Sequence, residues 1–144
     1  MTREEFEIYV DHFNNRRYDD VLSYFADDVR VQYFAPFVIG EPEGKVLNGR
    51  EAFRESYEHL HSTITETMEL RHFLCDGKNL YAELWTEFHA NEDTEDFSAG
   101  VLKKGEDFVA TNFVLYWLDE DGKYKDIRIA HHEVHDSSEA FLLK

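Results

Sequence analysis

Two histidines, a tyrosine and an asparagine interrupt the otherwise apolar rows of predicted strands: His72, His131, Tyr33 and Asn112. An imidazole has an unperturbed pKa of ~6.5, so it can take up or release a proton near neutral pH. A tyrosine hydroxyl and an asparagine amide can hold the oxygen of a developing enolate through hydrogen bonds. The residue types therefore predict general acid–base catalysis beside a carbonyl group, which requires no cofactor, with these four residues as the catalytic candidates.

Each candidate also has a structural interpretation. An amide in the middle of an apolar strand costs ~1–3 kcal/mol unless it is bonded, so Asn112 marks either a pocket or a structural bond to a loop. His72 could be a core histidine bonded to the backbone, and Tyr33 could be a plain core tyrosine. His89 stands at a strand end among acidic residues, where it could be a solvated surface side chain.

The last predicted strand carries a cluster of histidines, His131-His132-Glu133-x-His135. Neighbouring residues of a strand face opposite sides, and residues four apart are separated by ~13 Å. The spacing therefore does not bring the imidazoles together as ligands, and we expect no metal site.

The stretch from Glu66 to His89 predicts two long antiparallel strands joined at Asp76-Gly77, a dipeptide typical of tight hairpins. One apolar row of each strand is expected to lie on a shared face: Met68, Leu70, His72 and Leu74 with Leu80, Ala82, Leu84, Thr86 and Phe88. This pairing requires a loop with an odd number of residues. The simplest is a three-residue loop with Gly77 in the left-handed conformation. It places His72 on the inward face and His89 on the opposite face.

Hydrophobic periodicity and capping signals predict the remaining elements. The predicted helices and strands are Arg3–Asn14, Tyr18–Phe25 and about Asn48–Ser62, then Val29–Phe34, Phe97–Leu102, Phe108–Leu118 and Tyr124–Val134. The segment Ala35–Leu47 is expected to be a loop that covers core or a pocket mouth. Three N-terminal helices and a mainly antiparallel sheet indicate the α+β class. A curved sheet over a helix leaves a cone-shaped hollow for a small apolar ligand.

Length, charge and cysteine content limit the kind of protein. A chain of 144 residues is expected to form one domain, residues 1–144, with a real core. The net charge of −16 repels phosphate backbones and anionic lipid, and no apolar run approaches ~20 residues, so we expect neither nucleic-acid nor membrane binding. A single cysteine, Cys75, and an acidic amphipathic N-terminus unlike a secretory signal fit a cytoplasmic location.

The strand Phe108–Leu118 is largely apolar on both faces. Only one of its rows can face the helices, so the other row needs a different cover. Tyr81 and Trp85 on the neighbouring strand extend this outer apolar surface. We therefore expect a homodimer through the outer face of the sheet, and a small molecule as the other binding partner.

The element order, with the segment FNNRRYDDVLSYFADDVRVQYF followed by a helix and strands that turn at DGK, resembles the NTF2-like superfamily. Within it, the chain most resembles the SnoaL-like polyketide cyclases, ketosteroid isomerase and scytalone dehydratase. The resemblance extends over nearly the whole chain. It implies a cone-shaped α+β barrel in which three N-terminal helices pack on a curved, mainly antiparallel sheet.

The resemblance also implies roles for individual positions. Tyr9 stands where ketosteroid isomerase has its oxyanion-hole tyrosine, and Tyr33 stands where that enzyme has its carboxylate base. Tyr33 and Asn112 match the strand tyrosine and pocket asparagine of scytalone dehydratase, whose two strand histidines match His72 and His89. Together with the inward rows, this implies a set of substrate-binding candidates: Tyr9, Phe13, Asn14, Val114, Tyr116 and His89.

Two functions follow as hypotheses. The first is a cofactor-independent lyase, isomerase or cyclase that acts on a small, apolar, oxygenated metabolite of polyketide or terpenoid type. The second is a non-catalytic module that binds a small ligand or another protein, because this fold supports both.

Overall fold

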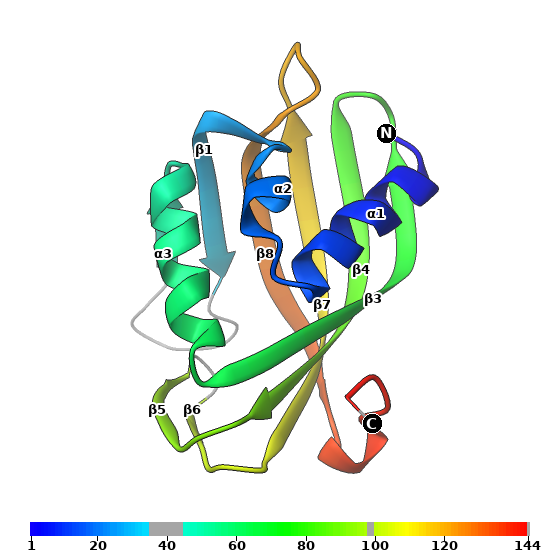
Figure 1. Cartoon of the computed structure of the whole chain (residues 1–144). Helices are drawn as coiled ribbons and strands as arrows, with labels where there is room; N and C mark the ends of the chain where they lie inside the picture. The colour runs from blue at the N-terminus through cyan, green and yellow to red at the C-terminus, as the bar shows by residue number, and fades with distance from the viewer. Residues whose placement is uncertain (35–44, 98–99, 144) are drawn as a thin grey trace.

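A curved six-stranded sheet with its three α-helices on one face forms the protein, as a computed structural model shows for residues 1–34, 45–97 and 100–143 (Figure 1). The helices are α1 Arg3–Asn14, α2 Tyr18–Leu22, α3 Arg50–His61 and the short 3-10 helix η1 Ser137–Glu139. The strands are β1 Phe25–Phe34, β2 Lys45–Asn48, β3 Ile64–Cys75, β4 Asn79–Ala90, β5 Thr94–Phe97, β6 Gly100–Leu102, β7 Asp107–Leu118 and β8 Tyr124–His135.

The main sheet has the order β2-β1-β8-β7-β4-β3, and β5 pairs with β6 in a separate small sheet. Neighbouring strands are antiparallel except β1 and β8, which are parallel. We call the face that carries α1, α2 and α3 the inner face, and the opposite one the outer face (Figure 1). The predicted α+β class, with helices on a curved and mainly antiparallel sheet, is confirmed.

The first helix begins where its capping signal predicts. The Thr2 hydroxyl accepts from the Glu5 N–H, and the Glu5 carboxylate accepts from the Thr2 N–H, so two free N–H groups of the first turn are satisfied. The third helix differs from prediction, because its N-cap is Gly49, at φ 89°, without a side-chain cap. The pattern Asn48-x-x-Glu51, in which an acid follows a capping residue, predicts an N-cap at Asn48, and this prediction is wrong.

The hairpin of β3 and β4 follows the predicted register only in its first half. Pairing runs regularly from Ile64 opposite Ala90 to Leu70 opposite Leu84, and then shifts by one residue at Arg71. The turn is correspondingly shorter than expected, since the Asp76 N–H already bonds the Asn79 carbonyl at 3.1 Å. A bulge reverses the facing of every residue beyond it.

The bulge corrects two inward assignments. His72 pairs with Glu83 at 3.1 Å and its side chain is 74% exposed, so it lies on the outer face. Leu74 is likewise 68% exposed. Phe73 and Cys75 take the inward places and pack against the core cluster.

The core is an aromatic cluster between α1 and the sheet. Tyr9 contacts the rings of Phe6, Phe25, Tyr116 and Tyr124 with centroid distances of 5.3–6.5 Å. Burial raises the pKa of Tyr9 well above its usual value, and the neighbouring Tyr116 adds to the shift. This cluster fills the end of the sheet on which the N-terminal half of α1 packs.

The C-terminal segment covers part of the outer face. The Glu87 carboxylate is fully buried and accepts hydrogen bonds from the Trp85 indole and from the backbone N–H groups of Phe141 and Leu142, at 2.7–3.1 Å. The Trp85 ring also lies 6.1 Å from that of Phe141. The chain itself therefore covers the surface around Trp85, and the expected dimer contact is left with the remainder of the outer face.

Replacing Glu87 with alanine is expected to lower the free energy of unfolding by about 3 kcal/mol, because it leaves three partly buried N–H donors without an acceptor. Glu87→Gln keeps one acceptor oxygen, and we expect it to cost less. Urea denaturation measures both changes. Glu83→Ala, which removes only the partner of the exposed His72, is the matched control and should stay within about 0.5 kcal/mol of the parent protein. Equal effects of Glu83→Ala and Glu87→Ala would contradict the role of this carboxylate.

Two further expectations concern the ends of the sheet. The predicted covering loop Ala35–Leu47 lies mostly outside the described residues, and its last residues belong to β2. The predicted edge strand Phe97–Leu102 corresponds to the end of β5 together with β6. Within residues 1–34, 45–97 and 100–143, no helix has the length and apolar character needed to cross a membrane.

Candidate functional site

Three polar side chains form a hydrogen-bonded row across the inner face of β4, β7 and β8. The Asn112 amide nitrogen donates to the Thr86 hydroxyl at 3.0 Å, and His131 Nδ1 lies 2.5 Å from the Asn112 amide oxygen. Thr86 and Asn112 are buried, with 0% and 6% of their surface exposed. The row arises because Asn112 lies opposite His131 in the sheet, while Thr86 is a diagonal neighbour on β4.

This row fixes the state of the His131 ring. Because the amide nitrogen of Asn112 is occupied by Thr86, its oxygen must accept, and Nδ1 of His131 must carry the proton. The pKa of His131 is lowered by burial. A neutral ring with its proton on Nδ1 presents a lone pair on Nε2, which is the form that a general base needs.

The lowered pKa of His131 predicts a pH-dependent stability. The unfolded chain binds a proton at this residue near pH ~6.5, whereas the folded protein binds it only at lower pH. The contribution of His131 is therefore complete above pH ~6.5 and is lost as the pH falls through the window below it, with a slope of up to about 1.4 kcal/mol per pH unit. Chemical denaturation between pH 7.5 and 5 measures the slope. His131→Gln should reduce it, and an unchanged slope would contradict the prediction.

A pair of tyrosine hydroxyls lies on the neighbouring part of the inner face. Tyr33 on β1 and Tyr57 on α3 are bonded through their hydroxyls at 2.5 Å. Burial, opposed by the bond to Tyr57 and assisted by the charge of Glu66, raises the pKa of Tyr33. Burial likewise raises the pKa of Tyr57 well above its usual value. Both hydroxyls therefore remain protonated, which is the form that can donate to a substrate oxygen.

The sheet register places the tyrosine pair beside the histidine row. Tyr33 lies opposite Ile129 on β8, and His131 follows two residues later on the same face. Diagonal neighbours of this kind lie ~7–8 Å apart at the backbone, within reach of two aromatic side chains. The C-terminal ends of β1 and α3, which carry Tyr33 and Tyr57, point toward the β5–β6 end of the molecule (Figure 1).

A buried carboxylate and imidazole form a third polar group where α3 meets β3. His61 Nε2 lies 3.0 Å from Glu66 Oε1, and both side chains are almost completely buried. The other ring nitrogen, Nδ1, lies 2.6 Å from the Tyr18 hydroxyl. The His61 ring is 5.6 Å from that of Tyr57, one helical turn earlier, so this group adjoins the tyrosine pair.

Several predicted site residues lie away from this arrangement. His72 is on the outer face, as the Arg71 bulge requires, so its predicted inward position is wrong. His89 lies opposite and 2.5 Å from Asp107, on the face of Trp85 and Glu87, and so does not line the inner face. The Asn14 amide bonds both the N–H and the carbonyl of Met68, at 2.8 and 2.9 Å, so it ties α1 to the edge strand β3.

The other predicted binding residues are buried in the core. Tyr9, Val114 and Tyr116 are at most 4% exposed, within the aromatic cluster and its surroundings. Phe13 lies closer to the polar groups, with its ring 5.3 Å from Tyr57 and 5.7 Å from His61. Of the candidates, the structure thus brings together Tyr33, Asn112 and His131, with Phe13 as an apolar neighbour.

Four residues of the arrangement were missed by the sequence reasoning: Tyr57, His61, Glu66 and Thr86. Signals for three of them exist. Tyr57 and His61 follow Phe53 at four-residue intervals, which places them on one helix face. Glu66 precedes Met68 by two residues and so shares its inward row. Thr86 belongs to the predicted inward row, but its type and position alone indicate no role in the site.

The histidines of the last strand do not come together. His131 faces inward, His132 stacks on Phe113 of the outer face at 4.2 Å, and His135 stacks on Trp85 at 4.5 Å. A bulge between the pairs Thr111–Glu133 and Asn112–His131 reverses the facing of β8, so His131 and His135 point to opposite faces of the sheet. Across the part of the chain that the structure describes, no three His, Cys, Asp or Glu side chains are grouped as metal ligands.

Comparisons with known proteins agree on the fold. The sequence model of the SnoaL-like domain family matches residues 6–127. A search of curated proteins finds no match. Among solved structures, the chain is similar to SalBIII, described as an epoxide hydrolase/cyclase-like enzyme in pyran ring formation in the polyether salinomycin. Identity is 18%, coverage is 90% of this chain and 89% of that one, and the TM-score is 0.66.

Two further solved structures have the same architecture. An NTF2-like protein from Burkholderia pseudomallei K96243 is 15% identical over 96% of this chain and 95% of that one, with a TM-score of 0.65. A SnoaL-like polyketide cyclase from Agrobacterium tumefaciens strain C58 is 16% identical over 89% and 88%, with a TM-score of 0.64. The family match covers most of the chain, and the structural likeness extends over nearly all of it. The chain therefore belongs to the SnoaL-like domain family and has the NTF2-like fold.

Proposed function

We propose that this protein is a cofactor-independent enzyme that moves a proton next to a carbonyl group of a small, apolar, oxygenated metabolite. The observation that carries the proposal is the row Thr86–Asn112–His131, which holds a neutral histidine with a free lone pair beside two protonated tyrosine hydroxyls. The histidine is suited to take a proton from carbon, and the hydroxyls are suited to hold the oxygen that becomes negative.

The proposed step follows from these roles. Nε2 of His131 removes a proton from the carbon next to the carbonyl, and the imidazolium is oriented through Nδ1 by Asn112. The Tyr33 hydroxyl donates to the carbonyl oxygen as it becomes an enolate. His131 then returns the proton to another atom of the substrate, which completes an isomerisation, a ring closure or the loss of a hydroxyl as water.

The substrate class follows from the surroundings of these groups. The inner face beside them consists of apolar side chains of α1, α3 and the sheet, among them Phe13, Leu70, Leu84 and Ile129. Such walls suit a ring system with few oxygens, and the formal charge of −16 disfavours a polyanion. Membership of the SnoaL-like family and the polyketide cyclase among the similar structures support a polyketide-type or terpenoid-type substrate.

A panel of enolisable aryl ketones and β-diketones in D₂O tests the proposal. Mass spectrometry follows replacement of hydrogen by deuterium at the carbon next to the carbonyl. The full chain should accelerate exchange for at least one member of the panel. Ligand NMR detects binding of the panel members. Binding without accelerated exchange would contradict the enzymatic proposal and favour a non-catalytic binding module.

We also propose that the protein forms a homodimer through the exposed remainder of the outer face. Tyr81, Phe113, Leu115 and Trp117 lie there, with the Arg128 guanidinium 4.2 Å above the Trp117 ring. The C-terminal segment contacts the region of Trp85 and Glu87 instead.

Light scattering coupled to gel filtration should give twice the mass of the chain. Leu115→Glu is expected to shift the protein toward the monomer, because a charge at the centre of an apolar interface loses its water. Ile8→Glu changes an equally apolar residue that is 53% exposed on the helical side, and it should leave the dimer intact. A monomeric parent protein would contradict the proposal.

A further inference from the structure

We propose that Tyr18, His61 and Glu66 form a proton relay that connects a surface depression with a carboxylate in the wall of the inner face. The relay deepens the proposed function, on which it rests, because it names the route by which protons are exchanged between the site and water. It uses a buried acid and a buried histidine that the step at His131 leaves unused.

The contacts of the relay are continuous. The Tyr18 hydroxyl lies 2.6 Å from His61 Nδ1, and His61 Nε2 lies 3.0 Å from Glu66 Oε1. Exposure falls along it, because Tyr18 is half-buried whereas His61 and Glu66 are 4% and 7% exposed. Tyr18 also lines a surface depression, whose other lining residues are Arg16, Arg17, Asp19, Asp20 and Arg54.

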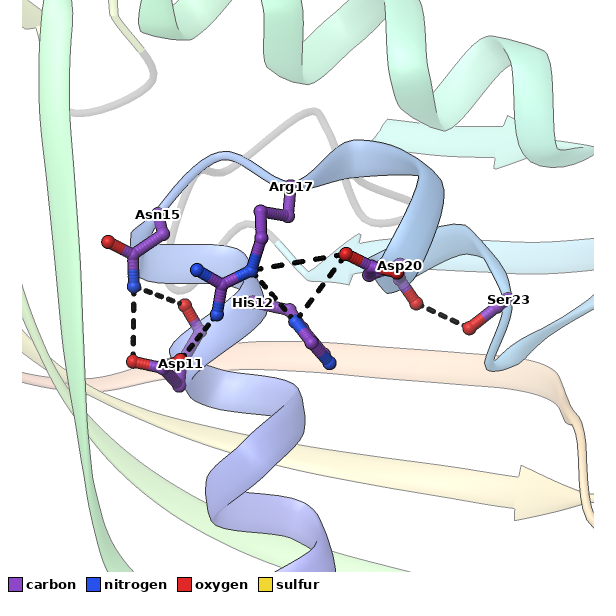
Figure 2. Close-up of polar contacts among 6 residues, drawn as sticks. All are labelled: Asp11, His12, Asn15, Arg17, Asp20 and Ser23. Atoms are coloured by element: carbon purple, nitrogen blue, oxygen red, sulfur yellow. Dashed lines mark hydrogen bonds and ion pairs between the residues drawn. The ribbon is translucent and has the colours of Figure 1, made fainter.

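The outer end of the relay is held by the turn between α1 and α2. Figure 2 shows Arg17 in contact with Asp11, His12 and Asp20, its Nε lying 3.0 Å from His12 Nδ1. On the other side of the depression, Arg54 of α3 pairs with Asp19. These contacts join the end of α1 and the middle of α3 to α2, which begins at Tyr18.

The inner end of the relay faces the proposed site. The charge of Glu66 helps to raise the pKa values of Tyr33 and Tyr57, for which burial is the main cause. The geometry agrees, because Glu66 is bonded to His61, whose ring lies 5.6 Å from that of Tyr57. A proton that arrives on Glu66 from the substrate side can leave only through a bonded partner, since the carboxylate itself is buried.

The transfer balances when each member gives up one proton as it receives another. At rest, Nε2 of His61 carries the proton and donates a hydrogen bond to the ionised Glu66. Tyr18 passes its hydroxyl proton to Nδ1 as its oxygen takes a proton from water in the depression, and Nε2 gives its proton to Glu66. The result is a protonated Glu66 that can supply the site, a neutral His61 protonated on Nδ1, and an intact Tyr18 hydroxyl. The reverse transfer, from protonated Glu66 to water, restores the resting state. Burial raises the pKa of Tyr18, with the charge of Arg16 acting against it and that of Glu58 adding to it, so the resting hydroxyl keeps its proton.

A purely structural role explains this arrangement less well. Removing a carboxylate from water costs several kcal/mol, and an apolar pair of the same size is often at least as stable. Two apolar residues at positions 61 and 66 would continue the rows of Phe53 and Tyr57 on α3 and of Met68 and Leu70 on β3. Such an apolar pair would lack the continuous hydrogen bonds that connect the surface depression with Glu66.

Nitrogen-15 NMR of the histidine-labelled full chain tests the relay without any substrate. The His61 ring is assigned by its loss in His61→Gln, and exchange of its ring proton with water is measured by saturation transfer. The parent ring should carry a proton on Nε2, the nitrogen that faces Glu66. Tyr18→Phe should slow that exchange at least tenfold. Tyr24→Phe, which changes another half-buried tyrosine with no bond to His61, should leave it unchanged.

An equal or faster exchange rate in Tyr18→Phe would overturn the relay, because water would then reach His61 by another path. Glu66→Gln gives an independent check: its amide cannot carry a proton onward, so the proton on His61 Nε2 should also exchange more slowly. The readout needs no turnover. A relay found intact in a protein that does not exchange the ketones would therefore leave the relay standing and remove only the proposed function.

Discussion

Replacing His131 with glutamine is expected to lower ketone hydrogen–deuterium exchange by 10²–10⁴-fold, the usual contribution of a positioned general base. Glutamine can still bond the Asn112 oxygen, so the row across β7 and β8 keeps a donor at this place. The glutamine side chain, however, cannot accept a proton at neutral pH. The loss should therefore appear in kcat, with little change in KM, because the ring is needed in the transition state rather than for binding.

The neighbouring histidine provides a matched control for this experiment. His132 stacks on Phe113 on the outer face, so His132→Gln makes the same chemical change on the other side of the sheet. It should leave exchange within twofold of the parent rate. If both variants lose activity equally, or if neither does, His131 is not the base.

The pH dependence of exchange gives a second check on His131. Burial lowers its pKa, so the active neutral form is dominant at pH 7 and is lost only below the usual titration range of histidine. The rate of ketone exchange should therefore be constant near pH 7 and should fall as the pH is lowered through the range in which His131 becomes protonated. A rate that rises on acidification through this range would contradict a neutral histidine base.

The fold could be predicted from the sequence because its signals are local and repeated. The apolar stripe of α1, the capping box at Thr2 and the long apolar run from Phe108 to Leu118 each follow from one element considered alone. The bulge at Arg71 could not be predicted in this way. A bulge depends on the partner strand and the twist of the sheet, and a one-residue shift was enough to turn His72 from the inner to the outer face.

The site was predicted only in part, for a related reason. Asn112 and His131 stand out because each interrupts an apolar row within its own strand. Glu66 and His61 belong to different elements, and each can be placed on the inward side of its own element, but neither element alone indicates that the two side chains meet. Their pairing depends on the short turn between α3 and β3, which folds one toward the other. Asn14 is the opposite case, because it is a predicted site residue with a structural role. Its amide bonds both the N–H and the carbonyl of Met68.

Removal of a single hydroxyl in Tyr33→Phe is expected to lower exchange by 10²–10³-fold, the usual cost of losing one donor to a developing oxyanion. The raised pKa of Tyr33 keeps the hydroxyl protonated across the working range, so the loss should not vary with pH. The change also leaves the buried Tyr57 hydroxyl without its partner, so the free energy of unfolding should fall by about 1–3 kcal/mol.

Tyr57→Phe separates the catalytic part of this effect from the structural part. Both single variants break the same hydroxyl bond, so they should cost similar stability, but only the tyrosine that contacts the substrate oxygen should cost 10²-fold or more in rate. Because the two hydroxyls act as one unit, the double variant should lose little more than the more damaging single variant. Tyr81→Phe on the outer face is the matched control. Equal rates in Tyr33→Phe and the parent protein would remove the oxyanion role from this pair and leave the proton transfer at His131 without its electrostatic partner.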